Sequence, residues 1–217
     1  MIILSDEAYT RRLAQGPITF FNRELCAYAD GYVDGKYISP QFMEQVRSIG
    51  SEPARFAFKD AQILFSRVDG LQQTLLTIAR YPKEDSAERM RRFYAQLEAW
   101  NWYAGEALRK ENGYLLSLSV TKLVLFGGRL ILAHNETLYP YHKWFLRVLE
   151  QVPEKPANLM ELIAALVAQP DREKIDQFFN LIGDFQPWEK TAAGWGSQFL
   201  VDSEMNWLNG KTPIDDL

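Results

Sequence analysis

The longest apolar stretch of the chain runs from Gly113 to Ala133, and as a helix it carries aliphatic residues on nearly every face. A helix that is apolar on all faces is one that packs on all sides within a protein core. Lys122 and Arg129 are its only charged residues, and a spacing of seven places them on the same helix face. Two charges near the middle make a membrane span costly. The pattern therefore predicts the central, buried helix of a bundle.

Helical periodicity continues on both sides of this stretch. Apolar positions spaced by three and four residues predict a long helix from Ser86 to about Lys110. Five more helices are predicted, over residues 71–80, 141–151, 159–168, 171–183 and 188–207. Only short loops separate them, which is typical of a bundle. Residues 69–217 are accordingly predicted to form an up-and-down helical bundle.

Residues 1–68 show a different pattern. The apolar run at 1–4 predicts a short strand, and serines at 5 and 39 mark the starts of helices that reach residues 15 and 49. The run at 18–21 reads as a strand, 24–29 as a helical turn, and Asp34-Gly35 as a tight turn. The sequence RFAFKDAQILFSR at 55–67 predicts two short strands, or one strand with a bulge. The expected fold class is α+β, mostly α. Residues 1–68 are expected to form a partial α/β domain with the remnant of a small mixed sheet, and the helical bundle follows it.

Composition narrows the possible functions. A formal net charge of -4 and a pI of about 5.3 argue against general nucleic-acid binding, because such proteins carry a basic surplus. The single cysteine, Cys26, excludes an internal disulfide and is typical of a reducing, cytoplasmic compartment. The first residues lack the pattern of a signal peptide. P-loop, GxGxxG, HExxH and GxSxG motifs are absent.

A dense group of polar and aromatic residues follows the apolar helix and contains both histidines of the protein. Its members are His134, Tyr139, Tyr141, His142, Lys143 and Trp144. Tyrosine and tryptophan rings can stack on a flat ligand, while His142 and Lys143 can meet an anionic group near a helix start. In the alternative interpretation, Tyr141 and Trp144 anchor the next helix in the core and Lys143 is solvated. The sequence leaves both interpretations open.

Two further patterns suggest chemistry. Arg129 and His134 are the residue types that a metal-independent RNase uses, but five residues along a helix are about 140° apart. They would converge only near a helix end or across a dimer. Glu24, Asp30 and Asp34 could hold Mg²⁺, yet Asp-Gly pairs are first of all turn formers. No metal site is assigned on this basis.

Three segments together resemble a known arrangement: GSEPARFAFKDAQILFSR at Gly50–Arg67, the long helix after it, and AHNETLYPYHKWF at Ala133–Phe145. They resemble the C-terminal portion of bacterial nucleotidyltransferases of the antibiotic-adenylylating superfamily. The resemblance implies a catalytic mixed sheet followed by a bundle, related to HEPN domains, that helps bind substrate. It also implies Mg²⁺ and a nucleotide triphosphate for an intact member, held by a Gly-Ser pair and an Asp-x-Asp motif.

No Asp-x-Asp occurs in this chain, so the resemblance is to a member whose catalytic front is missing. We therefore expect a cytoplasmic, nucleotidyltransferase-like protein that is inactive alone and has no cofactor of its own. It would bind a small-molecule or nucleotide ligand in the bundle cleft. The residues expected to bind this ligand are Lys122, Arg129, His134, Tyr139, Tyr141, His142, Lys143 and Trp144.

Two alternatives remain open at this point. The protein could be a HEPN-like RNase that uses Arg129 and His134, which requires a homodimer that brings both into one groove. It could also be a partner-binding subunit that completes a separately encoded catalytic chain. An exposed edge on the N-terminal sheet would favour the second alternative, because such edges accept an added strand.

Overall fold

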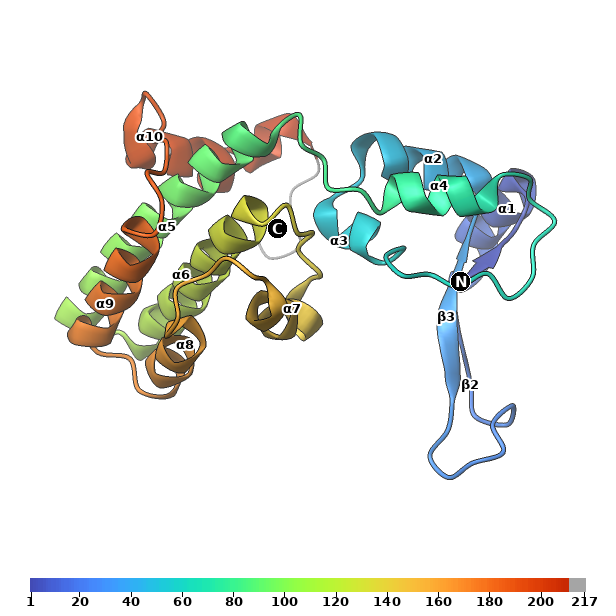
Figure 1. Cartoon of the computed structure of the whole chain (residues 1–217), viewed down its shortest axis with the longest axis horizontal. Helices are drawn as coiled ribbons and strands as arrows, with labels where there is room; N and C mark the ends of the chain where they lie inside the picture. The colour runs from blue at the N-terminus through green and yellow to red at the C-terminus, as the bar shows by residue number, and fades with distance from the viewer. Residues whose placement is uncertain (211–217) are drawn as a thin grey trace. The chain divides into compact units, whose positions relative to one another are not determined.

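The computed structural model describes residues 1–210 and consists of two compact units, Met1–Arg80 and the part from Tyr81 onward (Figure 1). It is α+β and mostly α, as predicted, with a three-stranded mixed sheet confined to the first unit. The division falls after residue 80, whereas the sequence placed it after 68. The difference arises because α4 (Leu71–Ile78) packs against α2 (Pro40–Ile49) in the core of the first unit.

The sheet has the order β1-β3-β2, with β1 (Ile2–Ile3) parallel and β2 (Thr19–Asn22) antiparallel to β3 (Val33–Ile38). The strands expected near residues 1–4 and 18–21 are confirmed. Assigning Asp34-Gly35 to a turn was wrong, because both lie in the central strand. Gly35 pairs with Phe20, and a Cβ at 35 would lie 2.6 Å from the Phe20 ring. The glycine therefore accommodates an aromatic side chain from the neighbouring strand.

Serine caps start three of the four helices in the first unit. Ser5, Ser39 and Ser51 each accept a hydrogen bond from the backbone N–H three residues on. They precede α1 (Asp6–Gln15), α2 and α3 (Glu52–Phe56).

Residues 24–29, where the sequence predicted a helical turn, are not helical.

The strands expected over residues 55–67 are not formed. The Ser51 cap and the proline at 53 begin α3 instead, and Arg55 turns back to donate hydrogen bonds to the carbonyls of Gly50 and Arg47. Phe58 is buried in the core, but Leu64 and Phe65 are 95% and 77% exposed. The cap at Ser51 therefore favours a helix at the start of this segment. The later residues, including Leu64 and Phe65, pair with no strand among residues 1–210.

The second unit is a bundle built on two long antiparallel helices, α5 (Ser86–Arg109) and α6 (Gly113–His134), which lie side by side (Figure 1). The remaining helices are η1 (His142–Trp144), α7 (Phe145–Gln151), α8 (Leu159–Ala168), α9 (Arg172–Gly183), α10 (Gly194–Phe199), the π-helical η2 (Leu200–Glu204) and η3 (Asn206–Asn209). The long helix predicted over 188–207 is broken: residues 188–193 are not helical, and three short elements follow.

Helix α6 forms the centre of the bundle core. It is the one described helix that is long and apolar enough to cross a membrane, and half of that apolar window is buried inside the bundle. Leu123, Leu130 and Ile131 are fully buried. At Gly127 and Gly128 the rings of Phe178 and Phe145 lie directly against the helix backbone. This is the packing of a core helix, as the apolar pattern predicted.

Substituting Gly128 tests this close approach. A Cβ at position 128 would lie 2.4 Å from the Phe145 ring, so Gly128→Ala should lower the free energy of unfolding by about 1–3 kcal/mol. Urea denaturation measures the change. Gly196→Ala is the matched control, because nothing lies within 4 Å of its added Cβ and it should stabilise by up to about 1 kcal/mol. A stabilised Gly128→Ala protein would contradict this packing.

Candidate functional site

The second unit contains a groove of about 1640 Å³ between α5, α6 and the C-terminal segment. Its lining residues are Arg89, Arg92, Phe93, Gln96, Trp100, Tyr103, Tyr114, Leu115, Leu118, Lys122, Phe126, Arg129, Phe199, Asp202, Ser203, Glu204, Asn206 and Trp207. Lys122 and Arg129 both line the groove, as their shared helix face implied. The groove combines cationic groups with aromatic rings, which suits a ligand that is anionic and partly flat.

Arg129 is held at one end of the groove by two rings. Its guanidinium carbon lies 4.1 Å from the centroid of Phe93 on α5 and 4.8 Å from that of Tyr139. Guanidinium groups stack favourably on such faces, and the contact fixes their orientation. Phe126, one turn before Arg129 on α6, packs 6.2 Å from Phe93 between ring centroids. This end of the groove is therefore rigid and positively charged.

Lys122 contributes a second positive charge, two turns before Arg129 on α6. It is half-buried, and within residues 1–210 its ammonium group forms no hydrogen bond or ion pair. A lysine that lines the groove without a counter-ion among these residues can donate charge-assisted hydrogen bonds to an anionic ligand.

Aromatic side chains form the other end of the groove. Trp100 and Tyr103 of α5 pack against Phe199 of α10, with ring centroids 5.6 and 5.5 Å apart. Tyr114, in the first turn of α6, is 80% exposed and also lines this end of the groove. The groove thus changes from charged to aromatic along its length.

Hydrogen bonds to α5 fix the C-terminal wall. Arg92 Nε and Nη2 donate to Asp202 Oδ1 at 3.0 and 2.7 Å, and the bond raises the pKa of Arg92. Gln96 Nε2 donates to Ser203 Oγ at 3.0 Å and its Oε1 accepts from Trp100 Nε1 at 3.0 Å. These bonds hold η2 against α5 and so complete the groove.

The turn at residues 139–144 lies outside the lining of this groove. Tyr139 is buried, and its hydroxyl is 3.1 Å from His142 Nδ1. Tyr141, His142, Lys143 and Trp144 are exposed. Tyr139 is the link to the groove, since its ring contacts Arg129. Of the residues expected in one cleft, only Lys122 and Arg129 line it.

His134 points to a different part of the bundle. Its Nε2 is 2.9 Å from Glu154 Oε2, and its ring meets Phe185 and Trp188 edge-on at 5.4 and 6.3 Å. Arg129 lies instead against the rings of Phe93 and Tyr139. Within one chain the two side chains therefore have separate environments, as the 140° spacing implied. In the described part of the chain no three His, Cys, Asp or Glu side chains gather into a possible metal site.

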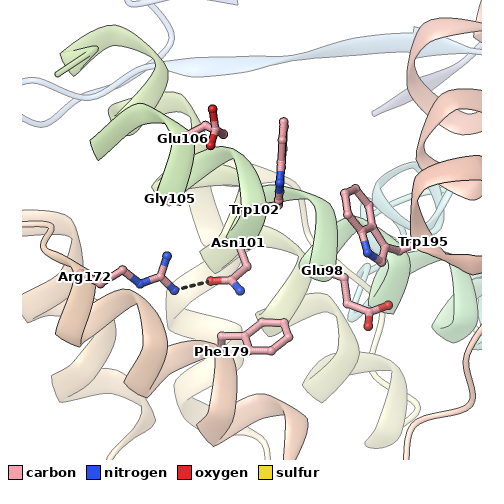
Figure 2. Close-up of a pocket in the computed structure, with 8 residues that line it drawn as sticks. All are labelled: Glu98, Asn101, Trp102, Gly105, Glu106, Arg172, Phe179 and Trp195. Atoms are coloured by element: carbon pink, nitrogen blue, oxygen red, sulfur yellow. Dashed lines mark hydrogen bonds between the residues drawn. The ribbon is translucent and has the colours of Figure 1, made fainter. Parts of the chain in front are cut away.

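A second, smaller cavity of about 390 Å³ lies where α5 meets α9 and α10 (Figure 2). Its lining residues are Glu98, Asn101, Trp102, Gly105, Glu106, Arg172, Phe179 and Trp195. Sequence reasoning did not find it, because residues from three distant helices build it. The available signal was Trp102, a tryptophan that lies off the apolar spacing of the helix predicted over residues 86–110.

Neither a known protein family, a characterised protein nor a solved structure gives a significant match to this chain. The description of this protein therefore rests on its fold and its groove. It is a two-unit, mostly α protein whose helical bundle has a groove lined by basic and aromatic residues.

Removing the Arg92–Asp202 ion pair should loosen the C-terminal wall. Asp202→Asn is expected to increase amide hydrogen exchange of residues 200–209 by about two- to fivefold, as for other partly exposed pairs. Glu44→Gln removes the exposed pair with Arg47 in the first unit and should leave this exchange unchanged. Equal exchange in all three proteins would show that the ion pair does not hold η2.

Proposed function

We propose that the second unit is a ligand-binding bundle whose groove takes a small-molecule or nucleotide ligand. The observation that carries the proposal is Lys122, a partly buried lysine whose ammonium group has no hydrogen-bond or ion-pair partner among residues 1–210. It lines a groove that Arg129 also lines. The ligand's anionic group would lie at Lys122 and Arg129. A flat ring would lie toward Trp100 and Tyr103, where ring faces are offered.

We further propose that the chain is nucleotidyltransferase-like and that its bundle has the substrate-binding role. A groove that takes a small-molecule or nucleotide ligand agrees with that role. We also propose a cytoplasmic location. The described residues do not fit the two-metal site of that superfamily, because they offer no cluster of metal-ligating side chains. The sequence also has no Asp-x-Asp. No nucleotide transfer by this chain alone is therefore part of the proposal.

Titration with ATP, AMP, adenosine and inorganic pyrophosphate by calorimetry tests the groove. Phosphate-bearing ligands should bind, and Lys122→Met should weaken their binding roughly tenfold or more, since it removes a charge-assisted hydrogen bond. Arg129→Lys should also weaken it, because lysine keeps the charge but loses the stacked, planar group.

Lys143→Met is the matched control, because Lys143 is exposed and lies outside the groove. Equal losses for Lys122→Met and Lys143→Met would reject the groove in favour of the turn at 139–144. Transfer of label from ATP to an acceptor in the presence of Mg²⁺ would overturn the inactive role.

A second function, binding of a partner chain, is favoured by the open edge of the sheet. Tyr37 donates to the Ile18 carbonyl, so alternate residues of β2 bond inward to β3. By this alternation the backbone groups of Thr19 and Phe21 face outward, and no backbone partner meets them within residues 1–210. Exposed Phe21 and Tyr32 stack beside this edge at 5.3 Å. Such an edge accepts a strand from another chain.

Proline substitutions in β2 distinguish the loss of strand pairing with another chain from the loss of folding stability. We expect self-association of the full chain in light scattering, and Phe21→Pro should abolish it while leaving the thermal midpoint nearly unchanged, because the lost N–H faces outward. Phe20→Pro is the control: its N–H faces β3, so the variant should unfold more easily. A wild-type chain that is monomeric at all concentrations would argue against this edge as a self-association site.

A further inference from the structure

Helix α5 presents two chemically different faces. At 100° per residue, Arg89, Phe93 and Gln96 point to the groove, while Glu98, Trp102 and Gly105 lie on the opposite side. The second face forms the 390 Å³ cavity with α9 and α10. We propose that this cavity is a binding site for an organic cation of the quaternary or tertiary ammonium type, separate from the groove.

Aromatic rings supply the first part of such a site. Trp102 and Trp195 lie 6.3 Å apart between ring centroids, with their planes inclined by 38°. Phe179 of α9 lines the cavity below them in Figure 2. Trp102 is half-exposed although it belongs to a well-packed helix, so part of its ring face is open to a ligand. Methylated ammonium groups bind such ring faces through their electron-rich π surfaces.

Two shielded carboxylates supply the second part. The Glu98 and Glu106 side chains, on the same helix as Trp102, are only 16% and 23% exposed. Hydrogen bonds from Arg109 lower the pKa of Glu106, so it carries a negative charge at neutral pH. Two partly shielded carboxylates that line the cavity beside the tryptophans favour a cationic ligand there.

The counter-ions of these carboxylates lie at the surface and are replaceable. Lys190 Nζ is 3.0 Å from Glu98 Oε1, and Arg109 Nε is 3.1 Å from Glu106 Oε1. Lys110 Nζ is 3.6 Å from Glu106 Oε2, and all three basic side chains are at least 60% exposed. Exposed pairs of this kind contribute little, because water and salt screen them. A ligand cation inside the cavity can therefore compete for the carboxylates.

The cation that lines the cavity is already neutralised. Arg172 Nε donates to Asp176 Oδ2 at 2.7 Å, and Nη2 donates to Asn101 Oδ1 at 3.2 Å (Figure 2). Gly105 leaves room for this arginine, since a Cβ there would lie 2.9 Å from Arg172 Nη1. The arginine is thereby drawn to one side of the cavity, and the tryptophan–carboxylate side remains for a ligand.

Choline and its uncharged isostere 3,3-dimethylbutan-1-ol test the proposal on the full chain. The indole N–H signals of Trp102 and Trp195, identified with Trp102→Phe and Trp195→Phe, are followed by NMR during titration. Choline should shift both signals saturably, whereas the isostere should not. The two molecules have the same shape, so a difference between them reports the charge.

Variants assign the binding to the proposed groups. Trp102→Leu should weaken choline binding about two- to fivefold, and Glu98→Gln should weaken it by up to about fivefold. Lys190→Gln should strengthen it, because the variant removes the competitor for Glu98; a purely structural role of Lys190 would not give this gain. Glu161→Gln, an exposed carboxylate on α8, is the matched control.

The expected pattern is saturable binding of choline alone, weakened by Trp102→Leu and Glu98→Gln, strengthened by Lys190→Gln and unchanged by Glu161→Gln. Equal shifts with choline and the isostere, or no saturable shift with either, would overturn the proposal. So would the same loss in Glu98→Gln and Glu161→Gln. Circular dichroism of each variant confirms that it is folded before binding is compared.

Discussion

The enclosure of α6 is the constraint on which the bundle depends. Its apolar residues lie on most faces of the helix, so several other elements must pack around it. At Gly127 and Gly128 this covering becomes a direct contact between the α6 backbone and the rings of Phe178 and Phe145. The positions of α7 and α9 follow from it, and α5 covers a further side along its length. Lys122 and Arg129 then share one remaining partly open face, where the groove is formed.

Helix α5 distributes charge between the two cavities of the bundle. Its groove face carries arginines and packs on the charged face of α6, whereas its opposite face carries Glu98, Glu106 and Trp102. Helix α10 contributes to both, with Phe199 in the groove and Trp195 in the smaller cavity. A cationic and aromatic site and an acidic and aromatic site can thus coexist on one short bundle, because a helix separates the two sets of charges.

How far the sequence predicted these sites differs from residue to residue. Lys122 and Arg129 were assigned to one face from their spacing alone, since helix geometry is local. The groove's remaining walls were not predicted, because Asp202 and Ser203 reach α5 from more than one hundred residues away in sequence. The turn at 139–144 was expected in the same cleft. Tyr139 instead turns into the core under Arg129, and its exposed neighbours lie elsewhere.

The sequence by itself determined most of the bundle helices, the caps at Ser5 and Ser39 and the buried role of α6, because periodicity and capping act over a few neighbouring residues. It did not predict α3 or the break in the helix expected over 188–207. It did not determine β3, where Asp34-Gly35 resembles a turn until Phe20 of the paired strand lies across the glycine. Nor did it determine the structure of residues 55–67. Their residue types favour a strand, but no strand among residues 1–210 pairs with them. Strand pairing and the walls of a cavity depend on residues distant in the chain, so only the tertiary structure decided them.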